Sequence, residues 1–452
     1  MQLSWLALAT VIAAPALAAS PAAAAPAKLT LDQLIARATS GPRAAMAATD
    51  TARARARADE ASAARAPKLT AQGFLTISPE IRCVDVACTQ TAPDSFEWKF
   101  SGAFGGGSLL LTQPIYTFGK IATARDAAKA GVTAQTALEN ETAGDAAIDA
   151  ARAYWGLKLA RELRYMLEDG IDELAKAHAR MDERATDDSG DVTIQDRQRL
   201  ATIEAEAALQ LEDATQGEEI ALASVRALAG DDTVDIDDAP MAAIERDLGP
   251  VDELAARARA DRPQAQAARA GADAAHALAA FEARQYFPDL AIVGTAEYAE
   301  AQGVDHPPSW IYSQPYHKGG VGAALILRWQ LEPWTTHARV ERAEAEAHHA
   351  DALAAWAEVG ATLEARTAHT EAARAKRRID AATKGEEAAR TWVASVVQSD
   401  AIGTSETKDL ADAYLAWFQM RARLMNAIFQ WNVAAIRLDR ATGEFHPRSK
   451  RP

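Results

Sequence analysis

The chain has 452 residues, of which 49% are hydrophobic but only 6% aromatic, and its formal net charge is −15. The negative charge argues against nucleic acid as a partner. After the N-terminal segment, no apolar run has the length of a membrane-spanning helix, which argues against a polytopic helical membrane protein.

The N-terminal segment is typical of an export signal. Residues 5–18 are apolar, and small residues at 16 and 18 precede the expected cleavage point. Lysine and arginine are missing from its start, so a buried N-terminal helix is the alternative. The residue directly after the cleavage point is not a cysteine. We expect a signal peptide that is removed and a mature chain that is exported without a lipid anchor.

The two cysteines, Cys83 and Cys88, lie close together in the segment CVDVAC. Two thiols alone make a poor zinc site, and an exported protein folds under oxidising conditions. We therefore expect a disulfide between them that closes one small loop, and no metal site.

The chain repeats itself after about 220 residues. Residues 31–38 (LDQLIARA) are similar to residues 251–258 (VDELAARA). In both copies a proline and an Ala/Arg-rich run follow, and the run ends in Pro-x-Leu ahead of a predicted strand. The predicted organisation is a signal peptide at 1–18, a first repeat at 19–230, an acidic inter-repeat segment at 231–250, a second repeat at 251–443 and a C-terminal tail at 444–452.

Each repeat contains two predicted strands, at 69–78 and 98–117 and at 290–298 and 320–333. Large apolar residues alternate with small or polar ones, as in a strand with one face in lipid and the other in a wet lumen. The scarce aromatic residues gather here, as in the girdles of membrane barrels; a soluble sheet with an aromatic core is the alternative. Four strands cannot close a membrane barrel, and open edges do not occur in lipid, so three copies would be needed to supply about twelve strands.

Long helices complete each repeat. Residues 120–186 and 336–397 contain no proline and would each extend roughly 90–100 Å. Turn-rich segments follow at 187–191 and 399–403, and the returning helices lie at 193–229 and 404–442. Alanine-rich surfaces allow the helices of each hairpin to approach closely. The predicted fold is mainly α, with a membrane β-barrel that is continued by a long α-helical periplasmic barrel.

The junction between strand and helix at residues 111–120 (LTQPIYTFGK) resembles that of the TolC family of outer-membrane efflux proteins, with its Gln-Pro, aromatic residue and glycine. The second junction, residues 327–334, departs from the family pattern, and Thr335 stands where a glycine is usual. The turn segments at 190–196 and 401–410 are similar to the family's two helical tips. Together with the repeat, the strands and the export signal, the resemblance covers essentially the whole mature chain.

The resemblance implies a homotrimeric outer membrane factor of a Gram-negative bacterium, with a barrel in the outer membrane and a helical cylinder in the periplasm. Such a protein has no enzymatic activity and no cofactor. It is the passive exit duct of a tripartite efflux pump or a type I secretion system, for drugs or other cargo. Its partners are outer-membrane lipid, a periplasmic adaptor (membrane fusion protein) and an inner-membrane transporter.

The resemblance also assigns roles to residues at the tips. Asp409 and Asp412 match the aspartates of the periplasmic entrance ring, where clustered negative charges attract cations; an ordinary acidic first turn of a helix is the alternative. Asp196 matches an aspartate of the entrance lock. Asp400 and Ser405 occupy the positions of its two other partners, so the lock of the well-studied members is absent. The adaptor-docking tips are Gly190, Val192, Thr193, Ile402, Gly403 and Thr404.

A soluble periplasmic coiled-coil adaptor or scaffold without channel activity is the alternative function. It would explain the helical hairpins but not four amphipathic strands with aromatic ends. An enzyme is disfavoured because the chain has no nucleophile elbow, P-loop or dinucleotide-binding fingerprint. Membrane fractionation distinguishes the first two classes, since only the channel requires detergent for extraction.

Overall fold

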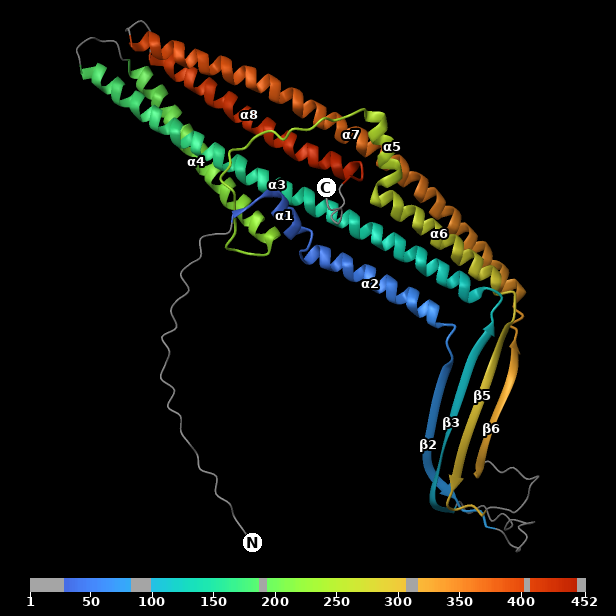
Figure 1. Cartoon of the computed structure of the whole chain (residues 1–452). Helices are drawn as coiled ribbons and strands as arrows, with labels where there is room; N and C mark the ends of the chain where they lie inside the picture. Colours follow the sequence, from blue (N-terminus) through green and yellow to red (C-terminus); the bar gives the residue numbers. More distant parts are fainter. Residues whose placement is uncertain (1–27, 83–98, 187–192, 306–315, 402–406, 445–452) are drawn as a thin grey trace, which may run out of the picture.

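The computed structural model describes residues 28–82, 99–186, 193–305, 316–401 and 407–444. Within them, one order of elements occurs twice: two short helices, two strands and two long helices (Figure 1). The first series is α1 (Leu31–Ala38), α2 (Pro42–Ala63), β2 (Lys68–Pro79), β3 (Phe100–Tyr116), α3 (Lys120–Thr186) and α4 (Ile194–Ala229). The second series is α5 (Val251–Asp261), α6 (Pro263–Arg284), β5 (Asp289–Ala301), β6 (Lys318–Arg328), α7 (Pro333–Ala401) and α8 (Thr407–Ala441).

Helices α3 and α7 are the longest elements, with 67 and 69 residues. At the α-helical rise each extends roughly 100 Å. Helix α7 begins at Pro333, a residue that suits the first turn because its missing amide has no partner to lose there. The prediction of a strand as far as residue 333 was therefore wrong, and β6 ends at Arg328. Among the described residues, no helix combines the length and the apolar character needed to cross a membrane.

The long helices lie side by side in one layer (Figure 1). Helices α2 and α4 contact one side of α3, and α6 and α8 contact its other side. Helices α6 and α8 also contact α7. The layer therefore has α7 at one edge and α2 with α4 at the other.

One face of this layer is covered, and we call it the covered face. It carries α1, the parallel pair of β1 (Lys28–Leu29) with β4 (Asp235–Ile236), and the segment 231–250. Tyr154 and Lys158 of α3 bind Asp237 there. On α8, the Trp431 indole donates to the Ile244 carbonyl oxygen at 2.8 Å. The largest buried cluster lies at this contact and includes Leu34, Leu157, Val225, Val234 and Ile236.

Strands β2, β3, β5 and β6 form an antiparallel sheet in the order β2-β3-β5-β6, at one end of the helical layer (Figure 1). The two halves of the chain meet in the pairing of β3 with β5. The strands are closely spaced at Gly106, where a Cβ atom would lie 2.6 Å from the carbonyl oxygen of Tyr298. Strands β2 and β6 are the edges of the sheet.

The two faces of the sheet differ in polarity, because side chains alternate along each strand and the register aligns them across strands. Leu69 pairs with Leu111, and Ile292 with Leu325. This apolar face carries Leu69, Leu75, Ile77, Leu109, Leu111, Leu290, Ile292, Val321, Leu325 and Leu327. The opposite face includes Lys68, Thr70, Gln72, Ser108, Thr112, Thr295, Glu297, Lys318 and Arg328. The apolar face is uncovered in the single chain, with Val321 at 89% and Leu75 at 80% exposure.

The two junctions between sheet and long helices also differ. At the first, Phe118 and Gly119 have positive φ angles of 49° and 89°. The Arg284 guanidinium donates to the Phe118 carbonyl oxygen at 2.9 Å, and a Cβ atom at Gly119 would lie 2.7 Å from Arg284 Nη1. This turn therefore requires glycine. Between β6 and α7, no described residue has a positive φ angle, and Thr335 lies in the first turn of α7.

Candidate functional site

The ends of the four long helices lie together at the pole of the molecule farthest from the sheet (Figure 1). We call this pole the tip region. Thr193 directly precedes α4, and Asp196 and Asp400 lie in the terminal turns of α4 and α7, although the side chains of these two aspartates are outside the described residues. Six of the predicted tip residues lie outside the described residues altogether: Gly190, Val192, Ile402, Gly403, Thr404 and Ser405. So do Cys83 and Cys88.

Asp409 and Asp412 lie on the first turns of α8, three residues apart and hence on one side of the helix. Asp412 accepts a charged hydrogen bond of 2.5 Å from Arg199 of α4. Both side chains are partly exposed to solvent. The two helical hairpins are thus joined at the tip region by an ion pair, in which Arg199 offsets part of the expected negative charge.

Sequence reasoning missed Arg199, although the repeat contains a signal for it. In the sequence, Arg199 follows Gly190 by the same interval, nine residues, that separates Asp412 from Gly403. Equivalent positions of the two repeats therefore carry opposite charges. Side chains at equivalent places in two neighbouring hairpins can meet, so this pair could have been found by aligning the repeats.

Behind the tip region, α4 is held to α3 by charged groups. His178 of α3 bonds Glu204 of α4 at 2.8 Å, and this hydrogen bond raises the pKa of the His178 imidazole. Further along, Glu218 of α4 accepts from both Arg161 and Arg164 of α3, at 2.9 and 2.7 Å. These contacts are partly solvated, and apolar packing accompanies them farther along α4, where the buried Val225 belongs to the largest buried cluster.

Near the tip region, helix α8 is held to its neighbours mainly by close packing. A Cβ atom at Gly170 of α3 would lie 2.9 Å from the Phe418 ring of α8, so the glycine lets the two helices approach closely. Gly385 of α7 approaches Met420 of α8 in the same way, with 2.9 Å from its virtual Cβ to the sulfur. The Trp417 indole donates to Glu386 of α7 at 2.9 Å.

An ion-pair network joins four helices at about the middle of the layer. Arg440 of α8 reaches Glu141 and Asp145 of α3, both at 2.6 Å, and Glu364 of α7 at 2.8 Å. Arg262, at the start of α6, is almost fully buried and also binds Glu364. Burial acts to lower the pKa of the Arg440 guanidinium, but the three carboxylates outweigh it and raise the pKa. The network therefore opposes sliding of the four helices past one another along their axes.

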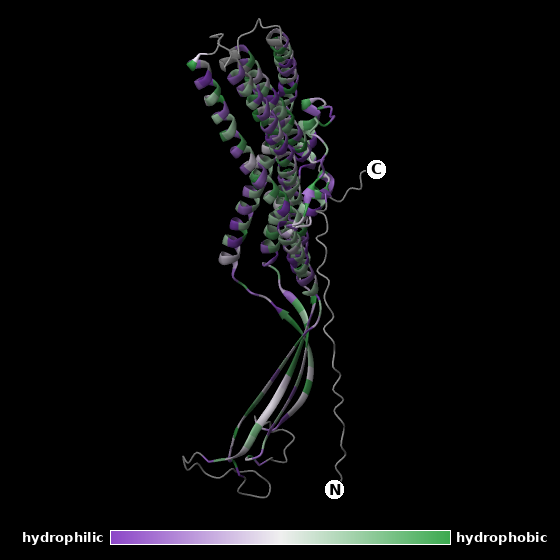
Figure 2. Ribbon diagram, turned by 90° about the vertical axis from the view of Figure 1, so that its left-hand side faces the viewer, coloured by the Kyte–Doolittle hydropathy of each residue, from purple (hydrophilic) through white to green (hydrophobic). Residues whose placement is uncertain are grey.

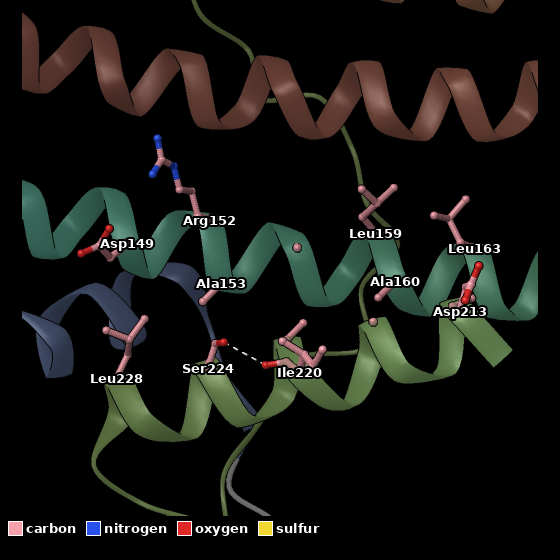
Figure 3. Close-up of a pocket in the computed structure, with 14 residues that line it drawn as sticks. Asp149, Arg152, Ala153, Leu159, Ala160, Leu163, Asp213, Ile220, Ser224 and Leu228 are labelled. Carbon is pink, nitrogen blue, oxygen red and sulfur yellow. Dashed lines mark hydrogen bonds between the residues drawn. The ribbon is translucent and has the colours of Figure 1, made fainter. Parts of the chain in front are cut away.

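A hollow of about 610 Å³ lies between α3 and α4. Figure 3 shows small and aliphatic side chains along it, among them Ala153, Leu159 and Ile220, with Arg152 directed away from α4. The hollow offers no set of convergent polar groups for catalysis. In the part of the chain that the structure describes, no group of three or more His, Cys, Asp or Glu residues could hold a metal ion.

Residues 254–444 match the model of a family described as outer membrane efflux protein. No curated protein matches the chain in a sequence comparison. The resemblance to outer-membrane efflux proteins that the strand-to-helix junction and tips predicted is confirmed.

Solved structures of outer-membrane channels have a similar fold. The outer-membrane channel OprN is 20% identical with a TM-score of 0.73, and the match covers 91% of this chain and 89% of that one. VceC from Vibrio cholerae is 20% identical with a TM-score of 0.72, over 91% of this chain and 96% of that one. CmeC from Campylobacter jejuni is 14% identical with a TM-score of 0.74, over 96% of this chain and 92% of that one. At these identities the likeness shows a shared fold.

Proposed function

We propose that this chain is an efflux channel of the outer membrane, in which three copies enclose one duct. The observation that carries the proposal is the four-stranded sheet, whose apolar face is bare in the single chain. A large uncovered apolar surface marks a contact with lipid or protein. Here the opposite face carries charged and hydroxyl side chains, as the lumen of a membrane barrel does.

The edges of the sheet support a closed assembly. Strands β2 and β6 each pair on one side only within the sheet. An unpaired edge is not tolerated in the hydrocarbon region, because its amide and carbonyl groups would have no partners. Pairing of β6 with β2 of the next copy removes every edge, and three copies make a barrel of about twelve strands, a size within the known range.

The helical layer supports the same assembly. It has α7 at one edge and α2 with α4 at the other, in the same order as β6 and β2 in the sheet. In a ring of three copies, α7 of one copy would pack against α2 and α4 of the next. The covered face would then lie outside, and the other face, which we call the open face, would line the duct.

In this proposal the tip region is the periplasmic entrance. Asp409 and Asp412 contribute to its ring of charge, and the ion pair between Asp412 and Arg199 links the two hairpins where they must separate for the entrance to widen. An inner-membrane transporter and a periplasmic adaptor, as in a tripartite pump or a type I secretion system, would deliver cargo here. The turns after α3 and α7 would meet the adaptor.

The decisive experiment is to express the full chain, fractionate the membranes and record currents from the purified protein in planar lipid bilayers. We expect the protein to require detergent for extraction, to run at three times the mass of one chain and to conduct ions. A soluble scaffold would leave the membrane without detergent and conduct nothing. That result would overturn the proposal.

A further inference from the structure

We propose that the open face carries a binding site for organic anions with an apolar body, at mid-height of the helical layer. The site is a hollow of about 410 Å³ over α8, between α3 and α7. Its lining contains four arginines and one glutamate: Arg152, Arg374, Arg378, Arg437 and Glu371. The inference rests on the proposed function, because a site on the wall of the duct would meet the cargo.

The charges in this hollow are not balanced. Glu371 pairs with Arg437 at 2.8 Å, and Arg378 donates to the Gln430 side chain at 2.7 Å. Within the described part of the chain, Arg152 and Arg374 have no ion pair or hydrogen bond from their side chains. Three guanidinium groups in this hollow, those of Arg152, Arg374 and Arg378, therefore have no carboxylate to neutralise them.

The carboxylates closest to the hollow are already paired. Asp145 and Asp149 line the adjoining hollow together with Arg152. Arg43 of α2 binds both of them, at 3.1 and 3.3 Å, and Arg440 also binds Asp145. The neighbouring acidic groups are thus engaged by other arginines, and the excess positive charge remains at Arg152, Arg374 and Arg378.

The floor of the hollow is apolar. It is formed by Phe429, Val433 and Ala434 of α8 and by Ala375 of α7. A planar guanidinium binds sulfonate, phosphate or carboxylate through paired hydrogen bonds, and the aromatic and aliphatic floor would take up the apolar part of the same molecule. A small inorganic anion would bind the guanidinium groups but would make no contact with the apolar floor.

The position of the hollow follows from the geometry of the three helices. On α7, Lys376 lies over the Trp431 ring on the covered face, 5.8 Å from its centroid. Arg374 and Arg378 are each two residues from Lys376, which places them on the opposite side of the helix. On α3, Arg152 lies two residues from Tyr154, which binds Asp237 on the covered face. Arg152 therefore lies on the opposite side of α3. The arginines therefore face the proposed duct.

The test uses a matched pair of probes, 1-naphthalenesulfonate and the uncharged 1-naphthalenesulfonamide, with the full-length protein. In planar bilayers we expect the sulfonate to block the current at a concentration at least about tenfold lower than the sulfonamide, the ratio that charge-assisted hydrogen bonds supply. The variant Arg152→Gln/Arg374→Gln should lose this preference. The variant Arg152→Lys/Arg374→Lys should keep part of it, since it keeps the charge but not the planar fork.

Lys376→Gln is the control, because it removes one positive charge at the same height on the covered face. In this variant the sulfonate should block the current at the same concentration as in the unchanged protein. Equal block by the two probes, or unchanged block in the double glutamine variant, would overturn the inference. Calorimetric titration of the detergent-solubilised protein with the two probes gives the same comparison without a current. A protein that binds the sulfonate but never conducts would overturn the proposed function and retain this site.

Discussion

The helices α4 and α8 occupy the same place in the two repeats but differ in the balance of packing and ion pairing that holds them. Helix α8 lies inside the layer, between α3 and α7, where Phe418 packs against Gly170 of α3 and Met420 packs against Gly385 of α7. Helix α4 lies at the edge, and ion pairs to α3 hold it beside a hollow. Position in the layer, more than place in the repeat, therefore determines how these two helices are stabilised. Figure 2 shows polar and apolar residues interspersed along the helices, while the sheet has long apolar stretches.

The largest expected effect comes from emptying the packing around α8. Trp431 is 2% exposed and its indole donates to the Ile244 carbonyl. Trp431→Ala should lower the free energy of unfolding by about 3–5 kcal/mol, measured by denaturant unfolding of the detergent-solubilised protein. Trp356→Ala on α7 is the control, because Trp356 is 72% exposed in the single chain. Equal losses in the two variants would contradict the assignment of α8 to the interior.

A smaller effect is expected from removing the charge that holds α4. Glu218→Gln weakens the bonds from Arg161 and Arg164, each of which keeps another acidic partner, Asp235 or Glu168. The expected loss of stability is about 1–2 kcal/mol, because the groups are partly solvated. It should shrink at high salt, whereas the loss in Trp431→Ala should not. A salt-independent loss would argue against an electrostatic attachment.

Two glycines, one on α3 against α8 and one on α4, differ in the space around them. A methyl group at Gly170 would press on the Phe418 ring, whereas a methyl group at Gly217 of α4 has nothing within 4 Å in the described structure. Gly170→Ala should cost about 1 kcal/mol of stability through overpacking. Gly217→Ala should instead add up to about 1 kcal/mol through helix propensity. Thermal unfolding of the two variants measures the opposite signs, and a gain in both would show that α3 and α8 can separate at no cost.

The smallest effect is a pH dependence near the tip region. Glu204 raises the pKa of His178 above its ordinary value, so the folded state favours the protonated imidazole. The stabilisation is complete below the unfolded pKa of about 6.5 and is lost as pH rises through the folded pKa. We expect hydrogen exchange in the first half of α4 to accelerate from about pH 6 to about pH 8. In His178→Gln this local acceleration, corrected for intrinsic exchange, should disappear.

The amphipathic strands and long helices were predictable because their patterns are local. The alternation of large apolar residues with small or polar ones along residues 320–327 is enough to predict a strand there. A long stretch without proline is likewise enough to predict a long helix. The ion pairs were not predictable in this way. Glu141 and Arg440 meet only because α3 and α8 become neighbours, and a single sequence does not state which helices are adjacent. Arg199 was the exception, since the repeat contained a signal for it.

The left-handed turn at Phe118 and Gly119 also bears on the history of the chain. Duplication of an ancestral gene would first have produced two identical junctions, and mutation would then have acted on both. At the first junction a side chain in place of Gly119 would be strained by the φ angle of 89° and would meet Arg284, so glycine is strongly favoured there. At the second junction no described residue has a positive φ angle, so the backbone accepts a residue with a side chain, such as Thr335. Stereochemistry thus determines where two halves of one protein can diverge, and Thr335→Gly should be tolerated far better than Gly119→Thr.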